Sequence, residues 1–307
     1  MKRGQGALLL LSCAAVLAAA LLPPFPQPQD YHRFADARTW FGVPNFLDVV
    51  SNLAFLGVAV AGLDAVLRSA RFIDRAERLP YVVFFLALAA TAFGSAWYHL
   101  APDNARLFWD RLPISLCLAA LLAVVIAERC RVRAKLLLPL LVALGAGTVW
   151  YWLHSENAGI GNVLPYFVFQ AYTLLAILLL MRFFPPRYSR SADLYRAVML
   201  YGAALLAESL DRHIYALGQI VGGHTLKHLL AALAVYQVVR MLRLRTAISS
   251  QDSGTFGQSG EAPTLHIHSC QDQQADQKIT AGDQYRQAVV ALREPAHQPV
   301  AYRAEDG

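Results

Sequence analysis

Charged residues are scarce in this sequence. Asp, Glu, Lys and Arg make up 16% of the 307 residues, hydrophobic residues make up 56%, and the mean hydropathy is +0.38. Soluble globular domains contain about 25% charged residues. The composition therefore excludes an ordinary soluble domain and predicts an integral membrane protein.

Cysteine is also scarce, with Cys13, Cys117, Cys130 and Cys270 as the four examples. Their spacing contains no CxxC pair, which excludes a disulfide framework and a cysteine-rich structural zinc site. The net charge of +6 does not indicate nucleic acid, because the basic residues cluster in short loops between apolar runs. We expect a lipid bilayer and a membrane lipid substrate as partners, no nucleic acid and no protein partner.

Long apolar runs dominate the sequence instead. Runs of about 20 residues are long enough to cross a membrane, and backbone groups in lipid must be paired within a helix. The fold class predicted is an all-α membrane protein, a seven-transmembrane-helix bundle. The expected spans are Leu47–Leu67, Pro80–Leu100, Ala105–Ala127, Leu136–Leu153, Val163–Phe183, Leu194–Leu210 and Gly222–Leu242.

Three further segments flank this membrane domain, which we place at 47–245. Residues 1–22 begin with Lys2 and Arg3 before an apolar run, a pattern typical of a signal peptide or a signal anchor helix. Residues 23–46 form an outer N-terminal segment. Residues 246–307 are polar and are predicted to be a disordered cytoplasmic tail.

The loops predict the orientation of the bundle. The first, third and fifth connections and the exit of the last span are rich in Lys and Arg, whereas the alternate connections have few. By the positive-inside rule, the rich connections and the C-terminus are cytoplasmic. The segment 23–46 then lies outside.

Five polar residues are placed by this topology at one depth near the outer face. Ser95 and His99 are four apart, on one helical face, at the end of the second span. Asp110 begins the third span, and His224 and His228, again four apart, begin the seventh. Ionisable groups in membrane helices are costly and tend to mark function.

Three His ligands with an open fourth position are typical of catalytic zinc. Zinc there would lower the pKa of water from 15.7 to about 7, Asp110 would accept the proton, and Ser95 would bond the water or the developing oxyanion. Other interpretations stay open: Asp110 only orients a His ring, and Ser95 bonds its own backbone or supports close packing.

The order and spacing of these residues resemble the alkaline ceramidase family, within the wider superfamily that includes PAQR receptors and Per1-type proteins. The carrying motifs are S-x-x-x-H at Ser95, Asp110 eleven positions after His99, DVVSNL from Asp48, and GHTLKHLLAA from Gly223. The resemblance covers about 36–242 and is closest to bacterial members. It indicates a bacterial inner (plasma) membrane protein, and the loop charges place its active site toward the outer face.

The resemblance also implies the site and the reaction. Zinc would be held by His99, His224 and His228, with Ser95 and Asp110 at the water. The reaction would be hydrolysis of the amide of an N-acylated lipid, such as ceramide, to a fatty acid and a sphingoid base or amine.

The N-terminal segment departs from the family. Eukaryotic members have an acidic calcium-binding segment, but the position of one of its Glu residues is Asn45 here, and Arg38 intrudes beside Asp36. The sequence therefore disfavours a calcium site, and we expect Asp36 and Arg38 to pair.

Other residues near the mouth of the site have simpler expected roles. Lys227 and Arg111 are expected to reach lipid phosphates. Asp211 either orients a ligand or is a hydrated loop charge. An interfacial aromatic belt is expected from Trp97, Tyr98, Trp109, Trp150, Tyr151 and Trp152.

Two other functions compete with hydrolysis. A PAQR-like receptor or lipid-binding protein would use the metal structurally, with little turnover. A haem-binding membrane protein would use His residues on separate helices as axial ligands, but it gives Ser95 and Asp110 no role.

Overall fold

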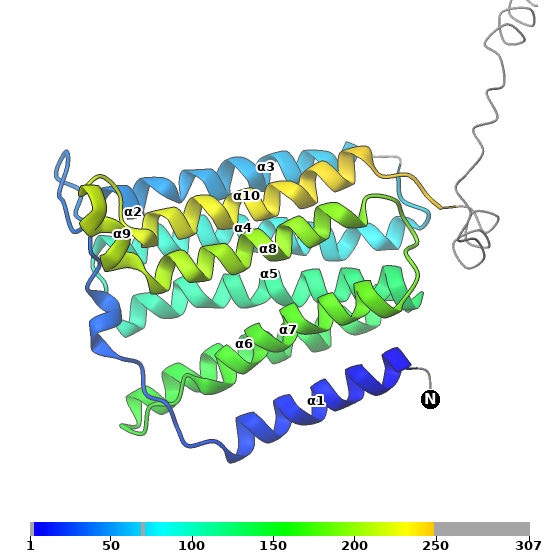
Figure 1. Ribbon diagram of the computed structural model, residues 1–307, viewed down its shortest axis with the longest axis horizontal. Helices are drawn as coiled ribbons and strands as arrows, with labels where there is room; N and C mark the ends of the chain where they lie inside the picture. Colours follow the sequence, from blue (N-terminus) through cyan, green and yellow to red (C-terminus); the bar gives the residue numbers. More distant parts are fainter. Residues whose placement is uncertain (1–2, 69–70, 249–307) are drawn as a thin grey trace, which may run out of the picture. The chain divides into compact units, whose positions relative to one another are not determined.

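A computed structural model of the protein describes residues 3–68 and 71–248, and these residues form helices and no strand, which confirms the all-α class. The long helices lie alongside one another (Figure 1). The α-helices are α1 (Arg3–Leu21), α2 (Phe46–Ser51), α3 (Leu53–Arg68), α4 (Arg78–Leu100), α5 (Asn104–Cys130), α6 (Ala134–Asn157), α7 (Leu164–Phe183), α8 (Ser191–Ser209), α9 (Asp211–Gly218) and α10 (Gly223–Leu244).

Seven helices in the described residues are long and apolar enough to cross a membrane, and they include the N-terminal one. They are α1, α2 with α3 (Phe46–Arg68), α4 with its preceding turn (Arg75–Leu100), α5, α6, α7 and α10. The chain is thus a multi-pass membrane protein. Six of the seven spans expected after the N-terminal segment are among these helices.

The predicted span Leu194–Leu210 forms α8, which lies in the bundle against α10. With Asp193, Arg196 and Glu208, α8 is not among the helices apolar enough to cross by composition, so its crossing of the membrane stays a prediction. Asp193 is fully buried and accepts bonds from Arg190, Arg196 and Arg240. Because these charges are paired inside the protein, α8 packs against α10 despite its polar composition.

The predicted first span is also two helices rather than one. α2 ends at Ser51, and Asn52 donates its side-chain amide to the Asp48 carbonyl at 2.7 Å before α3 begins. Asn45, which precedes α2, has a φ of 46°, a left-handed conformation that Asn tolerates. The short α2 turns the buried side chains of Asp48 and Ser51 toward α10.

α4 and α5 approach each other closely at Gly94. A Cβ atom on Gly94 would lie 2.0 Å from the Trp109 carbonyl oxygen and 3.4 Å from the Asp110 nitrogen. Only glycine permits this contact between backbones. The contact brings Ser95, the next residue on α4, beside the start of α5.

The N-terminal residues cross one end of the bundle. α1 packs against α7, where the Ser12 hydroxyl lies 3.1 Å from the Tyr172 hydroxyl. Residues 23–46, called the strap below, then run over the end at which α4 finishes and α10 begins (Figure 1). Whether α1 is a signal peptide or an anchor stays a prediction.

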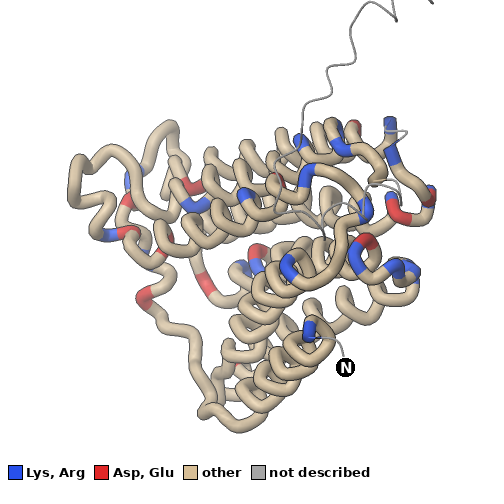
Figure 2. Tube along the Cα trace, turned by 45° about the vertical axis from the view of Figure 1, so that its right-hand side comes forward, with Lys and Arg blue, Asp and Glu red and all other residues tan. Residues whose placement is uncertain are grey.

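Basic residues gather at the opposite end of the bundle, where α3, α5, α7 and α10 finish (Figure 2). This distribution matches the loop pattern used to predict the orientation. Residues 249–307 lie outside the described residues, and so does most of the predicted tail.

Candidate metal centre and its cavity

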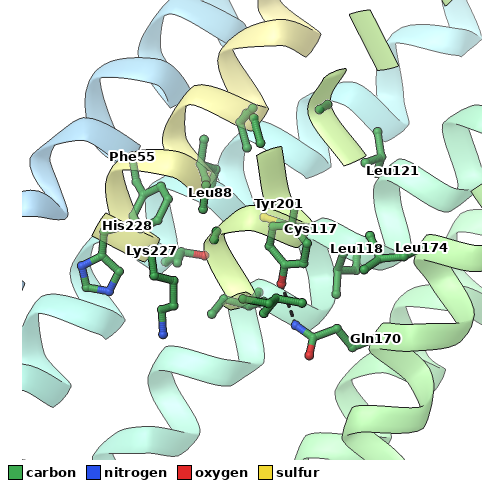
Figure 3. A pocket seen from close by; sticks show the side chains of 18 of the residues that line it. Phe55, Leu88, Cys117, Leu118, Leu121, Gln170, Leu174, Tyr201, Lys227 and His228 are labelled. Carbon is green, nitrogen blue, oxygen red and sulfur yellow. Dashed lines mark hydrogen bonds between the residues drawn. The ribbon is translucent and has the colours of Figure 1, made fainter. Parts of the chain in front are cut away.

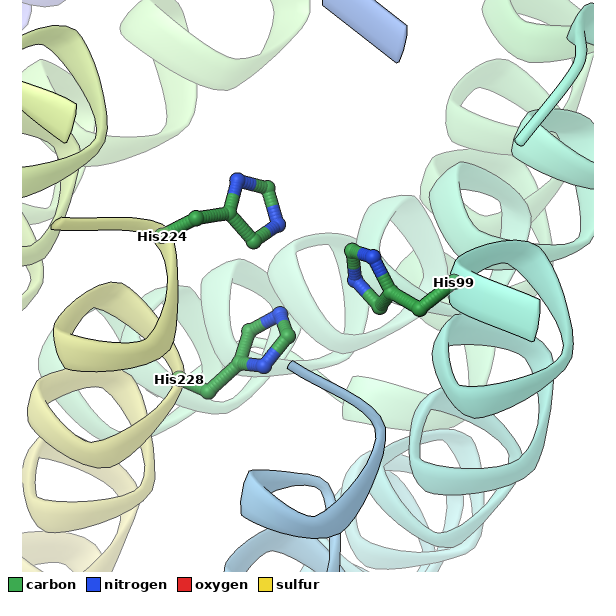
Figure 4. Close-up of side chains that lie close together, drawn as sticks. All are labelled: His99, His224 and His228. Atoms are coloured by element: carbon green, nitrogen blue, oxygen red, sulfur yellow. The ribbon is translucent and has the colours of Figure 1, made fainter. Parts of the chain in front are cut away.

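Three histidines converge beneath the strap. His99 comes from the last turn of α4, and His224 and His228 come from the first turns of α10 (Figure 4). Their ring centroids are 4.8, 5.1 and 5.0 Å apart, and one nitrogen from each ring lies within 4.8 Å of the others. All three side chains are buried. Segments more than 120 residues apart thus meet at one point.

The nitrogen atoms of this cluster fit a metal ion. Among the described residues, neither ring nitrogen of His99 nor Nε2 of His224 has a hydrogen-bond partner. Buried polar groups are normally paired, so unpaired nitrogens that face one another indicate a missing ligand. A neutral imidazole offers a lone pair to a metal, and three such groups are the donor set of many catalytic sites.

Two side chains outside the cluster bond its histidines, one at a ring nitrogen and one at the backbone. The Ser51 hydroxyl lies 2.7 Å from His228 Nδ1, which leaves Nε2 to face the other rings. Asp211 accepts from the backbone N–H of His224 at 2.9 Å and from that of Ala35 at 2.8 Å. Asp211 therefore caps the start of α10 and ties it to the strap, so it is not a hydrated loop charge.

The strap closes the cluster from the surface. The Phe34 ring lies 4.7 Å from the rings of both His99 and His224. Asn45 donates to the His99 carbonyl at 2.8 Å, and the two ring nitrogens of His32 contact the Tyr98 hydroxyl and the Asn104 side-chain oxygen. An apolar ring over the imidazoles keeps bulk water away from them.

Electrostatics in the strap favour neutral side chains. Burial lowers the pKa of His32, against the opposing hydrogen bond to Asn104. Burial also raises the pKa of Tyr31 well above its usual value, and the nearby Glu208 carboxylate adds to this effect. Tyr31 is therefore a neutral phenol whose hydroxyl donates a hydrogen bond to Glu208 at 2.8 Å.

A cavity of about 180 Å³ opens beside His228 and contains the other two predicted site residues. Ser95 and Asp110 both line it and are buried. The Ser95 hydroxyl is a side-chain hydrogen-bond partner of Asp110. Since a single buried water needs only roughly 10–15 Å³, the cavity has room for part of an organic ligand.

The rest of the cavity is an apolar channel between α4, α5, α7, α8 and α10 (Figure 3). On α8 its lining extends from Glu208 to Leu194, and 14 residues of helix span about 21 Å. Leu88, Leu118 and Leu174 are among the side chains along it. A polar end and a long apolar stem suit an amphiphile with a hydrocarbon chain.

Lys227 and Arg111 were expected to reach lipid phosphates at the membrane surface, and this prediction is wrong, because both side chains line the internal cavity. Arg111 is 3% exposed, and its guanidinium lies 4.5 Å from the centroid of the Trp152 ring. Lys227 pairs with Glu208 at 2.6 Å, and both residues line the cavity. Aromatic rings from distant segments enclose Arg111, and this enclosure could not be inferred from the sequence.

The predicted aromatic belt is only partly exposed. Trp97, Trp109 and Trp150 are 48%, 50% and 61% exposed. Tyr98 and Trp152 are fully buried and belong to the packing around His32 and Arg111. These two residues are therefore excluded from an interfacial belt.

The predicted pair of Asp36 and Arg38 is present. Arg38 donates from Nε and Nη2 to the two Asp36 oxygens, both at 2.7 Å. The strap thus offers a cation a carboxylate that is already neutralised, consistent with the expectation against calcium.

Sequence reasoning missed the roles of Ser51, Asp48 and Glu208. The motif around Asp48 was noted, but no role was assigned to it. Thr225 donates to Asp48, which together with the Ser51 contact locks α2 onto α10. The available signal was the group of three polar residues Asp48, Ser51 and Asn52 within an otherwise apolar run.

An apolar helical bundle with three converging imidazoles beside a lipid-sized channel defines a membrane protein with a candidate metal centre. A family model described as Ceramidase matches residues 42–259, more than half of the chain. The chain belongs to the ceramidase family, which confirms the resemblance and implies an amide hydrolase that acts on membrane lipids. No curated protein and no solved structure matches the chain.

Proposed function

We propose that the protein is a zinc-dependent hydrolase that cleaves the amide bond of an N-acylated lipid, ceramide or a related molecule, inside the membrane. The main support is the group of three buried imidazoles with unpaired nitrogens beside the channel that holds Ser95 and Asp110. Family membership supports the amide as the bond that is cleaved.

His99, His224 and His228 would hold the zinc ion. Bound zinc supplies Lewis-acid activation of water and of a carbonyl group near neutral pH. The nitrogens of His99 and Nε2 of His224 would lose no hydrogen bond on binding a metal, because they have no hydrogen-bond partner among the described residues. Ser51 would keep His228 in the tautomer that presents Nε2.

Asp110 would act as the general base and acid. Its buried carboxylate takes a proton from the attacking water and returns it to the amine that leaves. Ser95, beside Asp110, would donate its hydroxyl hydrogen to the oxygen on which negative charge develops. The apolar channel would hold the acyl chain and exclude water from the reaction.

The proposal is tested by incubating the purified protein in lipid vesicles with an N-acyl sphingoid base and measuring released fatty acid. Release should stop after treatment with a chelator and return when zinc is added. Unchanged release from metal-depleted protein would contradict it. Binding of the lipid without any release of fatty acid would instead favour a receptor-like role.

We also propose that the protein lies in a bacterial plasma membrane with the histidines toward the outer face and the C-terminus inside. The basic loops at the opposite end support this orientation. Fusing a reporter that is active only in the cytoplasm to the C-terminus should give signal, and an inactive reporter would reverse the assignment.

A further inference from the structure

A second polar group in the channel has no role in the proposed hydrolysis. Arg111 lines the cavity together with Ser95 and Asp110, and it is 97% buried, the complement of its 3% exposure. Its Nη1 has no hydrogen-bond partner among the residues that the structure describes. A guanidinium donor buried without an acceptor is costly, which indicates that a ligand accepts from it.

Aromatic rings hold this guanidinium in place. Its central carbon lies 4.5 Å from the Trp152 ring centroid, 5.2 Å from that of Tyr166 and 5.3 Å from that of Tyr31. Rings attract the charge through their faces but provide no hydrogen-bond acceptors in the plane of the guanidinium. The donor is therefore positioned in advance, with its hydrogen-bonding capacity unused at Nη1.

The carboxylates near Arg111 do not hydrogen-bond to its Nη1 atom. Glu208 is occupied by Lys227 at 2.6 Å and by Tyr31 at 2.8 Å. Asp110 and Glu208 balance Arg111 and Lys227 in number and attract Arg111 electrostatically. A divalent ion on the histidines would then give this end of the channel an excess of positive charge.

We propose that Arg111 is a specificity-determining residue that binds a carboxylate on a long-chain ligand, so that the enzyme prefers N-acyl amino acids to neutral N-acyl lipids. A guanidinium binds a carboxylate through charge-assisted, often bidentate, hydrogen bonds. A hydroxyl head group would offer Nη1 only a neutral acceptor, which forms a weaker hydrogen bond. This inference rests on the proposed amide hydrolysis, and it names the class of substrate.

The test compares two amides with the same acyl chain, an N-acylglycine and an N-acylethanolamine, which differ in the carboxylate. We expect Arg111→Gln to lower kcat/KM for the N-acylglycine roughly 10- to 100-fold, mainly through KM, as expected for loss of a charged hydrogen bond. The N-acylethanolamine should change by less than about threefold. Arg111→Lys should restore part of the difference, because it keeps the charge but not the fork.

Arg106→Gln is the matched control, since Arg106 lies on the same helix, bonds the Ala101 carbonyl and is not part of the cavity lining. It should leave both substrates unaffected. Equal losses with both substrates in Arg111→Gln would overturn the inference and assign Arg111 a purely structural role. Equal kcat/KM for the two amides in the unmodified protein would also overturn it.

A binding measurement separates this inference from the proposed function. Chelator-treated protein is titrated with hexadecanoate, N-hexadecanoylglycine and hexadecanol while thermal unfolding is followed. If the N-acyl sphingoid base and both of these amides stay intact, the proposed function fails, but tighter binding of the carboxylates than of the alcohol, lost in Arg111→Gln, would still support the anion site. Preference for hexadecanoate alone would place the released acid there and overturn the head-group assignment. If neither hexadecanoate nor N-hexadecanoylglycine binds more tightly than hexadecanol, the anion site itself is overturned.

Discussion

The two ends of the bundle both bury polar side chains, but they do so differently. At the end where α10 finishes, the charge of the fully buried Arg245 is compensated: its Nη1 donates to Glu128 at 2.6 Å and to Tyr81 at 3.0 Å, while Nε and Nη2, which have no hydrogen-bond partner among the described residues, lie among aromatic rings. At the other end, both ring nitrogens of His99 and the Nε2 atom of His224 converge on one point without a hydrogen-bond partner among the described residues.

The difference separates a structural cluster from a candidate site. Opposite charges that satisfy each other hold helices together and leave little to offer a ligand. Unpaired lone pairs that converge are a liability unless something binds them. Disrupting each end in turn should therefore have different consequences.

The largest effect is expected from His228→Ala. Removal of one of three ligands should reduce fatty-acid release to background, because the remaining two rings hold a metal weakly. The released acid is measured with protein in vesicles. His154→Ala, an exposed histidine stacked on Trp150, is the control and should keep full activity. Comparable activity in the two variants would disprove the role of His228.

Asp110→Asn should lower kcat by about 10²- to 10⁴-fold, the usual contribution of a general acid–base group. The amide keeps the size of the side chain but cannot accept a proton. Metal content should be unchanged, which distinguishes this variant from the histidine variants. A matching loss of metal would show that Asp110 acts by orienting the ligands instead.

Glu128→Ala should break the opposite end. Arg245 would then be a buried charge without its carboxylate, which destabilises a protein by about 3–5 kcal/mol. Thermal unfolding reports the loss, while the protein that stays folded should keep its activity per molecule. Arg243→Gln, which changes an exposed arginine in the last turn of α10, is the control. If Glu128→Ala lost activity without losing stability, the division between the ends would be wrong.

Ser51→Ala should have a smaller effect, a loss of roughly 10- to 100-fold in metal affinity, typical for removing a group that orients a ligating His. Competition with a fluorescent chelator measures it. Ser209→Ala removes an exposed hydroxyl that bonds its own helix backbone at the same end, and it should have no effect. Equal metal affinities in the two variants would show that the contact of Ser51 with His228 does not contribute to metal binding.

Apolar length and loop charge were enough to predict the helical class, the helices of the bundle and the convergence of distant histidines. They could not predict the ion pairs of α8, in which Asp193 and Glu208 are neutralised by Arg240 and Lys227 on α10. They failed for Arg111 because its aromatic enclosure comes from three segments. Side-chain partners across helices depend on packing, which periodicity does not encode.

The central claim is that imidazoles from two distant segments hold one metal ion. Elemental analysis of the purified protein tests it most directly, alongside the single variants His99→Ala, His224→Ala and His228→Ala. We expect about one zinc ion per chain in the unmodified protein and a large loss in each variant. Unmodified protein without stoichiometric metal after zinc loading, or variants that all retain it, would contradict the claim.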